Sequence, residues 1–205
     1  MLRTFSISEF VAYYRQQSGL AVTGSDCSIE VTDGIAVDGL IADALRRWYA
    51  EQLDTADPRL LPVSDVGSTL RPTAYAVPEG ACRLVFPAST RRIIFVQPES
   101  TGAPAVPQPA DALDEVLRMQ DNPYTAATAA EPEAVAVAGS RTEIYLWPTV
   151  TSIASAMAVI DPGSDTFVLD EILLSRLPAL SQIITHYPSP SPPIPSPSNH
   201  VKMGL

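Results

Sequence analysis

The stretch AVAVAGSRTEIYLW, residues 134–147, decides the fold class of this 205-residue chain. It holds two apolar runs, Ala134 to Ala138 and Thr142 to Trp147, on either side of Gly139-Ser140. Two such runs joined by a short link that contains glycine are typical of a β-hairpin. We therefore expect an antiparallel pair of strands at this point.

Further strands are predicted on both sides of this hairpin. Cys82–Phe86 and Arg91–Val96 predict two strands around the short loop Pro87–Thr90. Ala154–Ile160 predicts another strand after the hairpin, and Asp161-Pro162-Gly163 predicts the turn that ends it. The middle of the chain is therefore expected to be mostly β-structure.

Two helices are expected before these strands. Ser6 and Glu9 have the spacing of a capping box, in which each side chain binds a backbone N–H group at the helix start. Apolar residues at helical spacing follow, and Gly19 ends the run. The segment Ile35–Leu53 carries a broad apolar stripe and predicts the strongest helix of the chain. Its Trp48-Tyr49 pair is interpreted as a core or subunit contact rather than a ligand platform.

Two more helices are predicted downstream. In the helix expected over Ala110–Met119, Asp111, Asp114 and Glu115 lie in the first turns. The helix dipole favours anions there, so we interpret these carboxylates as dipole partners and not as acid/base groups. A last helix is predicted over Leu169–Tyr187.

Helix, strands and helix in separate blocks predict an α+β domain. We expect a mainly antiparallel β-sheet core with an N-terminal helical segment and a closing C-terminal helix. Residues 1–187 are expected to form this single domain, followed by an extended Pro/Ser-rich arm over residues 188–205. The 20 prolines also exclude a coiled coil or a long-helix bundle, because proline removes a helix hydrogen bond and clashes with the preceding turn.

The C-terminal arm predicts contact with a neighbour. Alternating proline and serine favour an extended, polyproline-like conformation. Such a segment is either a disordered tail or an arm laid along a neighbouring subunit. We favour the arm, and with it an assembly in which these prolines contact the neighbour: Pro188, Pro190, Pro192, Pro193, Pro195 and Pro197.

The charged residues exclude several functions. The formal net charge is −10, and Lys202 is the only lysine. A P-loop is excluded because it needs a lysine directly after its glycines. An acidic chain is also a weak binder of nucleic-acid backbone. We expect the doublets Arg46-Arg47 and Arg91-Arg92 to lie on a solvated face or to form salt bridges between subunits.

No pattern for catalysis or for a cofactor is found. Cys27, Cys82, His186 and His200 lack the short paired spacing of zinc ligands, and the cysteines are expected to be small buried hydrophobes. The stretch Asp161–Asp165 is similar to a calcium loop but lacks an oxygen ligand at position three, the glycine at position six and the terminal Glu. We therefore predict no enzymatic activity, metal or cofactor. Neither a signal peptide nor a membrane-spanning helix is expected.

The order of elements from Asp111 to Tyr187 carries a resemblance to a known family. A short helix leads to Asn122-Pro123-Tyr124, and the segment Glu143–Pro148 is a strand that ends in Trp-Pro. A returning strand then ends at Asp161-Pro162, before the last helix. This order resembles the head-to-tail connector, or neck ring, proteins of tailed bacteriophages, particularly those of short-tailed crAss-like phages. The segment Leu40–Leu61 is also similar to their N-terminal helix.

The resemblance implies a structural virion protein. It implies a subunit of a ring, commonly twelvefold, that is stacked between portal and tail and has a lumen for the genome. The expected partners are identical subunits, the portal and other neck or tail proteins, with passive DNA contact and no membrane. The expected location is the neck of the virion, after synthesis in the host cytoplasm. An acidic inner wall would let DNA slide, because few basic side chains would bind its phosphates.

A second hypothesis is a non-enzymatic adaptor. Proline-rich segments dock into aromatic grooves of partner proteins, and the C-terminal arm has that composition. A stable monomer that keeps its fold would favour the adaptor, whereas a closed assembly would favour the ring subunit.

Overall fold

The computed structural model describes residues 1–18, 37–74, 78–163 and 165–177. It confirms an α+β fold with mainly antiparallel sheets. The predicted arm over residues 188–205 lies outside the described residues, and so do Cys27, His186 and His200.

A five-stranded sheet contains the predicted hairpin. Its strand order is β3-β4-β8-β7-β6, and all neighbours are antiparallel except the short parallel pair β6–β7. The hairpin strands β7 and β8 pair Ala134 with Leu146, so the prediction from residues 134–147 is confirmed. The strands are β3 (Thr73–Ala74), β4 (Cys82–Val85), β6 (Pro107–Gln108), β7 (Glu133–Ala136) and β8 (Glu143–Trp147).

A three-stranded antiparallel sheet packs with the first one. It consists of β2 (Val63–Asp65), β9 (Ile153–Ile160) and β5 (Thr90–Pro98), with β9 in the centre. The strands predicted on either side of Pro87–Thr90 both exist as β4 and β5, but they belong to different sheets. The two sheets share a hydrophobic core, in which Leu84 and Ile144 from one sheet join Val96 and Ala158 from the other.

The helices α1 (Ile7–Gln17) and α2 (Val37–Thr55) confirm the two predicted N-terminal helices. The capping box of α1 is formed, because the Ser6 N–H donates to Glu9 Oε2 at 2.7 Å and the Glu9 N–H donates to Ser6 Oγ at 3.4 Å. The helix predicted over Ala110–Met119 is present as a 3₁₀ turn, η3 (Ala110–Ala112), followed by α3 (Leu113–Gln120). Two further 3₁₀ turns are η1 (Pro58–Leu60) and η2 (Gly67–Thr69).

The prediction of a last helix over Leu169–Tyr187 is wrong at its start. Leu169 and Asp170 belong to strand β10 (Thr166–Asp170), and the helix that follows, α4 (Glu171–Leu174), has only four residues. Strand β10 pairs in antiparallel register with β1 (Leu2–Ser6), a strand that the sequence did not predict. The rest of the predicted helix, from residue 178 on, lies outside the described residues.

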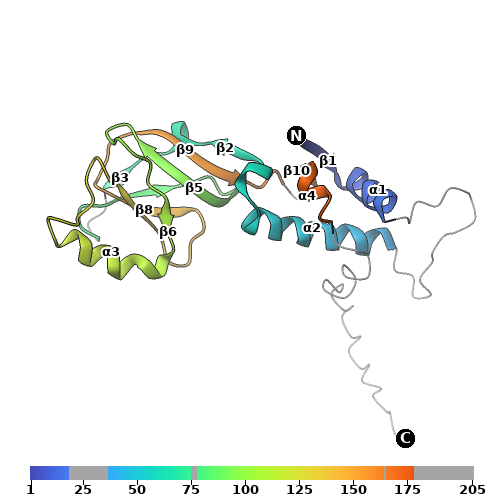
Figure 1. Cartoon of the computed structure of the whole chain (residues 1–205), viewed down its shortest axis with the longest axis horizontal. Coiled ribbons are helices and arrows are strands. Elements are labelled where there is room, and N and C mark those ends of the chain that lie inside the picture. The colour runs from blue at the N-terminus through green and yellow to red at the C-terminus, as the bar shows by residue number, and fades with distance from the viewer. Residues whose placement is uncertain (19–36, 75–77, 164, 178–205) are drawn as a thin grey trace, which may run out of the picture.

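The described residues form two large hydrophobic cores along the length of the molecule and a smaller cluster under α3 (Figure 1). The helical half buries α1, α2 and α4 against the β1–β10 pair, with Phe10, Leu45 and Phe167 in its centre. The sheet half holds the other two sheets, with α3 packed on their outside through Val116. Strands β5 and β9 run from one half into the other, because Val159 belongs to the helical core and its neighbours in β9 to the sheet core.

No helix within the described residues is long and apolar enough to cross a membrane.

Candidate functional site

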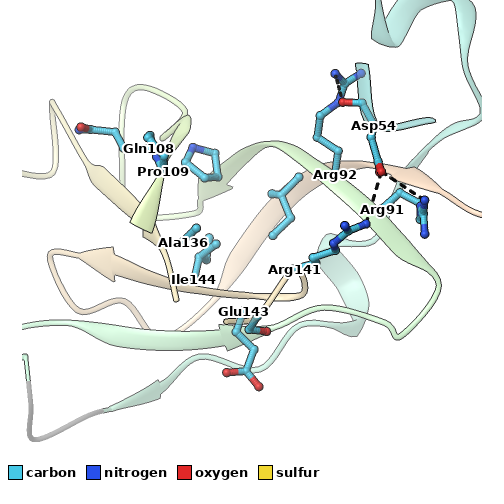
Figure 2. Close-up of a pocket in the computed structure, with 12 residues that line it drawn as sticks. Asp54, Arg91, Arg92, Gln108, Pro109, Ala136, Arg141, Glu143 and Ile144 are labelled. Carbon is cyan, nitrogen blue, oxygen red and sulfur yellow. Dashed lines mark hydrogen bonds and ion pairs between the residues drawn. The ribbon is translucent and has the colours of Figure 1, made fainter. Parts of the chain in front are cut away.

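A cleft of about 470 Å³ lies where the end of α2 meets the sheet half. Figure 2 shows that Asp54 from α2, Arg91 and Arg92 from β5, and Arg141 from the β7–β8 turn gather on one side of it. The rest of the wall is largely apolar and includes Ile93, Pro107, Pro109, Ala136 and Ile144. The cleft therefore combines a group of arginines with an apolar wall.

The carboxylate of Asp54 is the centre of the arginine group. Its Oδ2 lies 3.2 Å from Arg91 Nη2 and 3.4 Å from Arg141 Nη1. The same Arg91 nitrogen also donates to the Ala50 carbonyl at 3.4 Å. Two guanidinium groups therefore share one carboxylate, and Asp54 joins α2 both to β5 and to the hairpin turn.

Arg92 binds the C-terminal end of α2. Its Nη1 donates to the Asp54 carbonyl at 3.1 Å and its Nη2 donates to the Ala56 carbonyl at 2.5 Å. Carbonyl groups at the end of a helix have no partner within the helix and carry the negative end of its dipole. Because α2 has no basic residue in its own last turn, a cation from another strand fills this role.

The cleft is positive although the chain is acidic. Arg91, Arg92 and Arg141 line it, and the only carboxylate that binds any of them among the described residues is that of Asp54, which pairs with Arg91 and Arg141. Glu143 also lines the cleft, but it binds Arg83, whose Nε donates to Glu143 Oε2 at 3.1 Å. An arginine side chain stays protonated at all accessible pH values. The arrangement can therefore bind an anion.

The structure corrects the interpretation of one arginine doublet. Arg91 and Arg92 are half-buried and bind α2 within the same chain, so they do not form a solvated face, while the alternative of a salt bridge between subunits stays a prediction. In the other doublet, Arg47 is exposed as predicted, while Arg46 pairs with Asp43 at 2.9 Å and with Asp165 at 3.0 Å.

Asp54 and Arg141 are the charged residues of the arginine group that the sequence did not point to. Arg141 lies in the link of the predicted hairpin, so its place in a turn was predictable. Its position opposite Asp54 was not, because 87 residues separate the two along the chain and only the packing of the two halves brings them together.

Three further residues that the sequence pointed to, Trp48, Tyr49 and Cys82, have structural roles. Trp48 and Tyr49 are buried in the helical core, as predicted. Burial raises the pKa of Tyr49 to about 12, and its hydroxyl accepts from the Val168 N–H at 3.1 Å. Cys82 is fully buried, as predicted, and burial raises the pKa of its thiol.

The carboxylates Asp111, Asp114 and Glu115 are exposed in η3 and the first turn of α3. Within the described part of the chain, no group of three His, Cys, Asp or Glu side chains is arranged to hold a metal ion. The cleft around Asp54, Arg91, Arg92 and Arg141, called the arginine cleft below, is the candidate site.

Comparison with protein-family models finds no match for this chain, and comparison with curated proteins also finds none.

Proposed function

We propose that this chain is a structural virion protein, a subunit of a ring in the neck of a tailed phage. In this role it joins the capsid portal to the tail and surrounds the channel through which DNA leaves. The observation that carries the proposal is the order of elements around Trp147-Pro148. Strand β8 ends at Trp147, directly before Pro148, and β9 returns to Ile160, directly before Asp161-Pro162, which is the order that resembles the neck ring proteins.

The shape of the molecule supports the same role. A ring subunit has to keep two contact surfaces at a fixed distance. A pair of β-strands that contributes to both hydrophobic cores is suited to holding that distance. Strands β5 and β9 pair over most of their length and run from the helical half into the sheet half (Figure 1). Contacts between different surfaces of identical subunits close into rings when the rotation between neighbours fits.

The charge of the chain supports passive contact with DNA. A net charge of −10 gives a wall that repels phosphates, so a genome inside the ring would slide and not bind. The proposed partners are identical subunits in a twelvefold ring, the portal and the adjoining neck or tail proteins. The Pro/Ser-rich arm, Pro188–Pro197, is proposed to lie along the neighbouring subunit.

The test is to locate the chain in purified particles of the phage that encodes it. Mass spectrometry of the particles should detect it, and images of the portal vertex should show density of its shape in a ring. Absence from the particles would contradict the proposal. A stable monomer that never joins the portal would favour the adaptor hypothesis.

The arm has its own test. Deletion of residues 188–205 should leave the domain folded, with an unchanged unfolding midpoint, and should reduce incorporation into the ring. If the truncated chain enters particles as well as the full chain, the arm does not contribute to assembly.

A further inference from the structure

Helix α3 and its flanks expose four carboxylates that form no ion pair among the described residues. The opposite side of the helix is buried through Val116, so these carboxylates point outward. The nearby Arg118 donates from Nε to the Asp114 backbone carbonyl at 3.2 Å. We call this surface the acidic face: Asp111, Asp114, Glu115 and Asp121.

The arginine cleft has the opposite property. Arg91 and Arg141 share the carboxylate of Asp54, and the side chain of Arg141 is 66% exposed. One carboxylate between two guanidinium groups leaves a positive charge that a further carboxylate can neutralise. Guanidinium–carboxylate pairs are the strongest common contacts of this kind because two parallel hydrogen bonds form.

We propose that the arginine cleft of one subunit binds the acidic face of α3 from a second copy of this chain. The inference rests on the proposed function, since it names one contact between neighbouring ring subunits. Two chains of net charge −10 repel each other, and a contact between a positive and a negative surface offsets that repulsion. The cleft and the acidic face form such a pair.

The positions of the two surfaces favour a head-to-tail contact. The cleft lies where α2 meets the sheet half, whereas α3 lies along the outer side of the sheet half, at the end of the molecule away from α1 (Figure 1). When two copies bind through these two different surfaces, one copy still has a free cleft and the other still has a free acidic face. Further copies can therefore be added until the ring closes.

A carboxylate surface fits the cleft better than duplex DNA does. The guanidinium groups of Arg91 and Arg92 are half-buried inside a recess and are directed to Asp54 and to the end of α2. Backbone binding by DNA needs several exposed cations that neutralise successive phosphates. An exposed helix with carboxylates on one side can present one or two anions to such a recess.

The test uses two variants that each damage one half of the contact. Arg141→Glu reverses the charge of the most exposed arginine in the cleft and leaves the acidic face intact. Asp114→Arg combined with Glu115→Arg reverses the acidic face and leaves the cleft intact. In sedimentation experiments at low salt, each variant should self-associate at least about tenfold more weakly than the natural chain.

Mixing the two variants is the decisive measurement. One intact cleft and one intact acidic face remain in the mixture, and the two reversed surfaces are also complementary in charge. The mixture should therefore recover the association that each variant alone has lost. This recovery also shows that both variants are folded. The matched control Arg176→Glu has the same charge change on an exposed arginine of the helical half, and it should leave self-association within about twofold.

Three results would overturn the inference. They are a natural chain that stays monomeric at high concentration, a mixture that stays monomeric, and a duplex DNA mobility shift that is lost in Arg141→Glu. The ring role in the virion has separate tests, which are the presence of the chain in the particles and ring density at the portal vertex.

Discussion

Gly67 lies where two backbone segments cross with no room for a side chain. A Cβ atom at this position would lie 2.8 Å from Ser155 Cα and 2.9 Å from the Ala156 nitrogen, both of which are backbone atoms of β9. Asp65 binds both backbone segments at this point, because its Oδ1 accepts from the Gly67 and Ala156 N–H groups at 2.9 Å each. Two residues thus fix the approach of η2 to the central strand of the three-stranded sheet.

Gly67→Ala should therefore destabilise the protein. The added methyl group has to push β9 away, and overpacking of this kind costs about 1–3 kcal/mol in the free energy of unfolding. Gly39→Ala is the matched control, because a Cβ at this position in α2 meets nothing within 4 Å. Alanine is the better helix former by about 1 kcal/mol, so the control should be neutral or stabilising. Chemical denaturation measures both, and equal effects would contradict this account of Gly67.

Asp65 should make stability depend on pH in the acid range. The Ala156 and Gly67 N–H groups and the Ser155 hydroxyl donate to the ionised carboxylate and hold the pKa of Asp65 below its ordinary value of 3.8. A carboxyl group with a lowered folded pKa stabilises the protein above its unfolded pKa. That contribution is lost as the pH falls through the lowered value.

Asp65→Asn should accordingly lower the free energy of unfolding by about 1 kcal/mol at neutral pH, a value reduced for the exposure of the carboxylate. The difference from the natural chain should shrink below about pH 4. Denaturation curves between acid and neutral pH measure it. The control Asp111→Asn removes an exposed carboxylate, so an equal loss of stability in both variants would contradict the prediction.

The end of helix α2 depends on a residue from another element. Arg92 in β5 donates to the carbonyls of Asp54 and Ala56, which the helix itself leaves without partners. Arg92→Met keeps a side chain of similar length and removes both hydrogen bonds. We expect a loss of about 1–2 kcal/mol in the free energy of unfolding.

Two comparisons separate this role from simple packing. Arg92→Lys keeps the charge but loses the forked geometry, so its stability should fall between those of the natural chain and Arg92→Met. Arg176→Met changes an exposed arginine and should shift stability by less than about 0.5 kcal/mol. If Arg92→Met and Arg176→Met have the same free energy of unfolding, the binding of α2 by Arg92 adds nothing to stability.

The elements that the sequence predicted are those specified by neighbouring residues. The capping box Ser6–Glu9 and the hairpin around Gly139-Ser140 each need only a few consecutive residues, and both are present. The β1–β10 pair was missed because Leu2 pairs with Asp170 from the other end of the chain. Strand β10 has an alternating burial pattern, but at five residues it is too short to be distinguished from a turn of helix.

The candidate site was predictable only in part, for the same reason. Arg91-Arg92 is visible in the sequence as a doublet, but its partners are the carboxylate of Asp54 and the carbonyls at the end of α2. No spacing between residues near 54 and residues near 91 in the sequence predicts that contact. It follows from the crossing of β5 over the end of α2, which is a property of the tertiary packing.

The whole molecule raises the question of whether its two cores fold as one unit. Strands β5 and β9 contribute to both, since Ile94 and Val159 pack in the helical core and Val96 and Ala158 in the sheet core. The Asp54–Arg141 ion pair is a second link between the halves. A strand that is half unfolded would lose its register with its neighbour, so the shared ribbon should make unfolding cooperative.

The two tryptophans allow this to be measured, because Trp48 is buried in the helical core and Trp147 in the sheet half. In Trp147→Phe and Trp48→Phe, the remaining tryptophan reports the unfolding of one half, and we expect the two fluorescence transitions to coincide.

Leu146→Ala, at a fully buried position of the sheet core, should lower the free energy of unfolding by about 2–5 kcal/mol. When it is added to Trp147→Phe, the transition of the distant Trp48 should move to lower denaturant by the corresponding amount. An unmoved Trp48 transition would mean that the halves unfold separately, and the prediction of one domain over residues 1–187 would then be wrong.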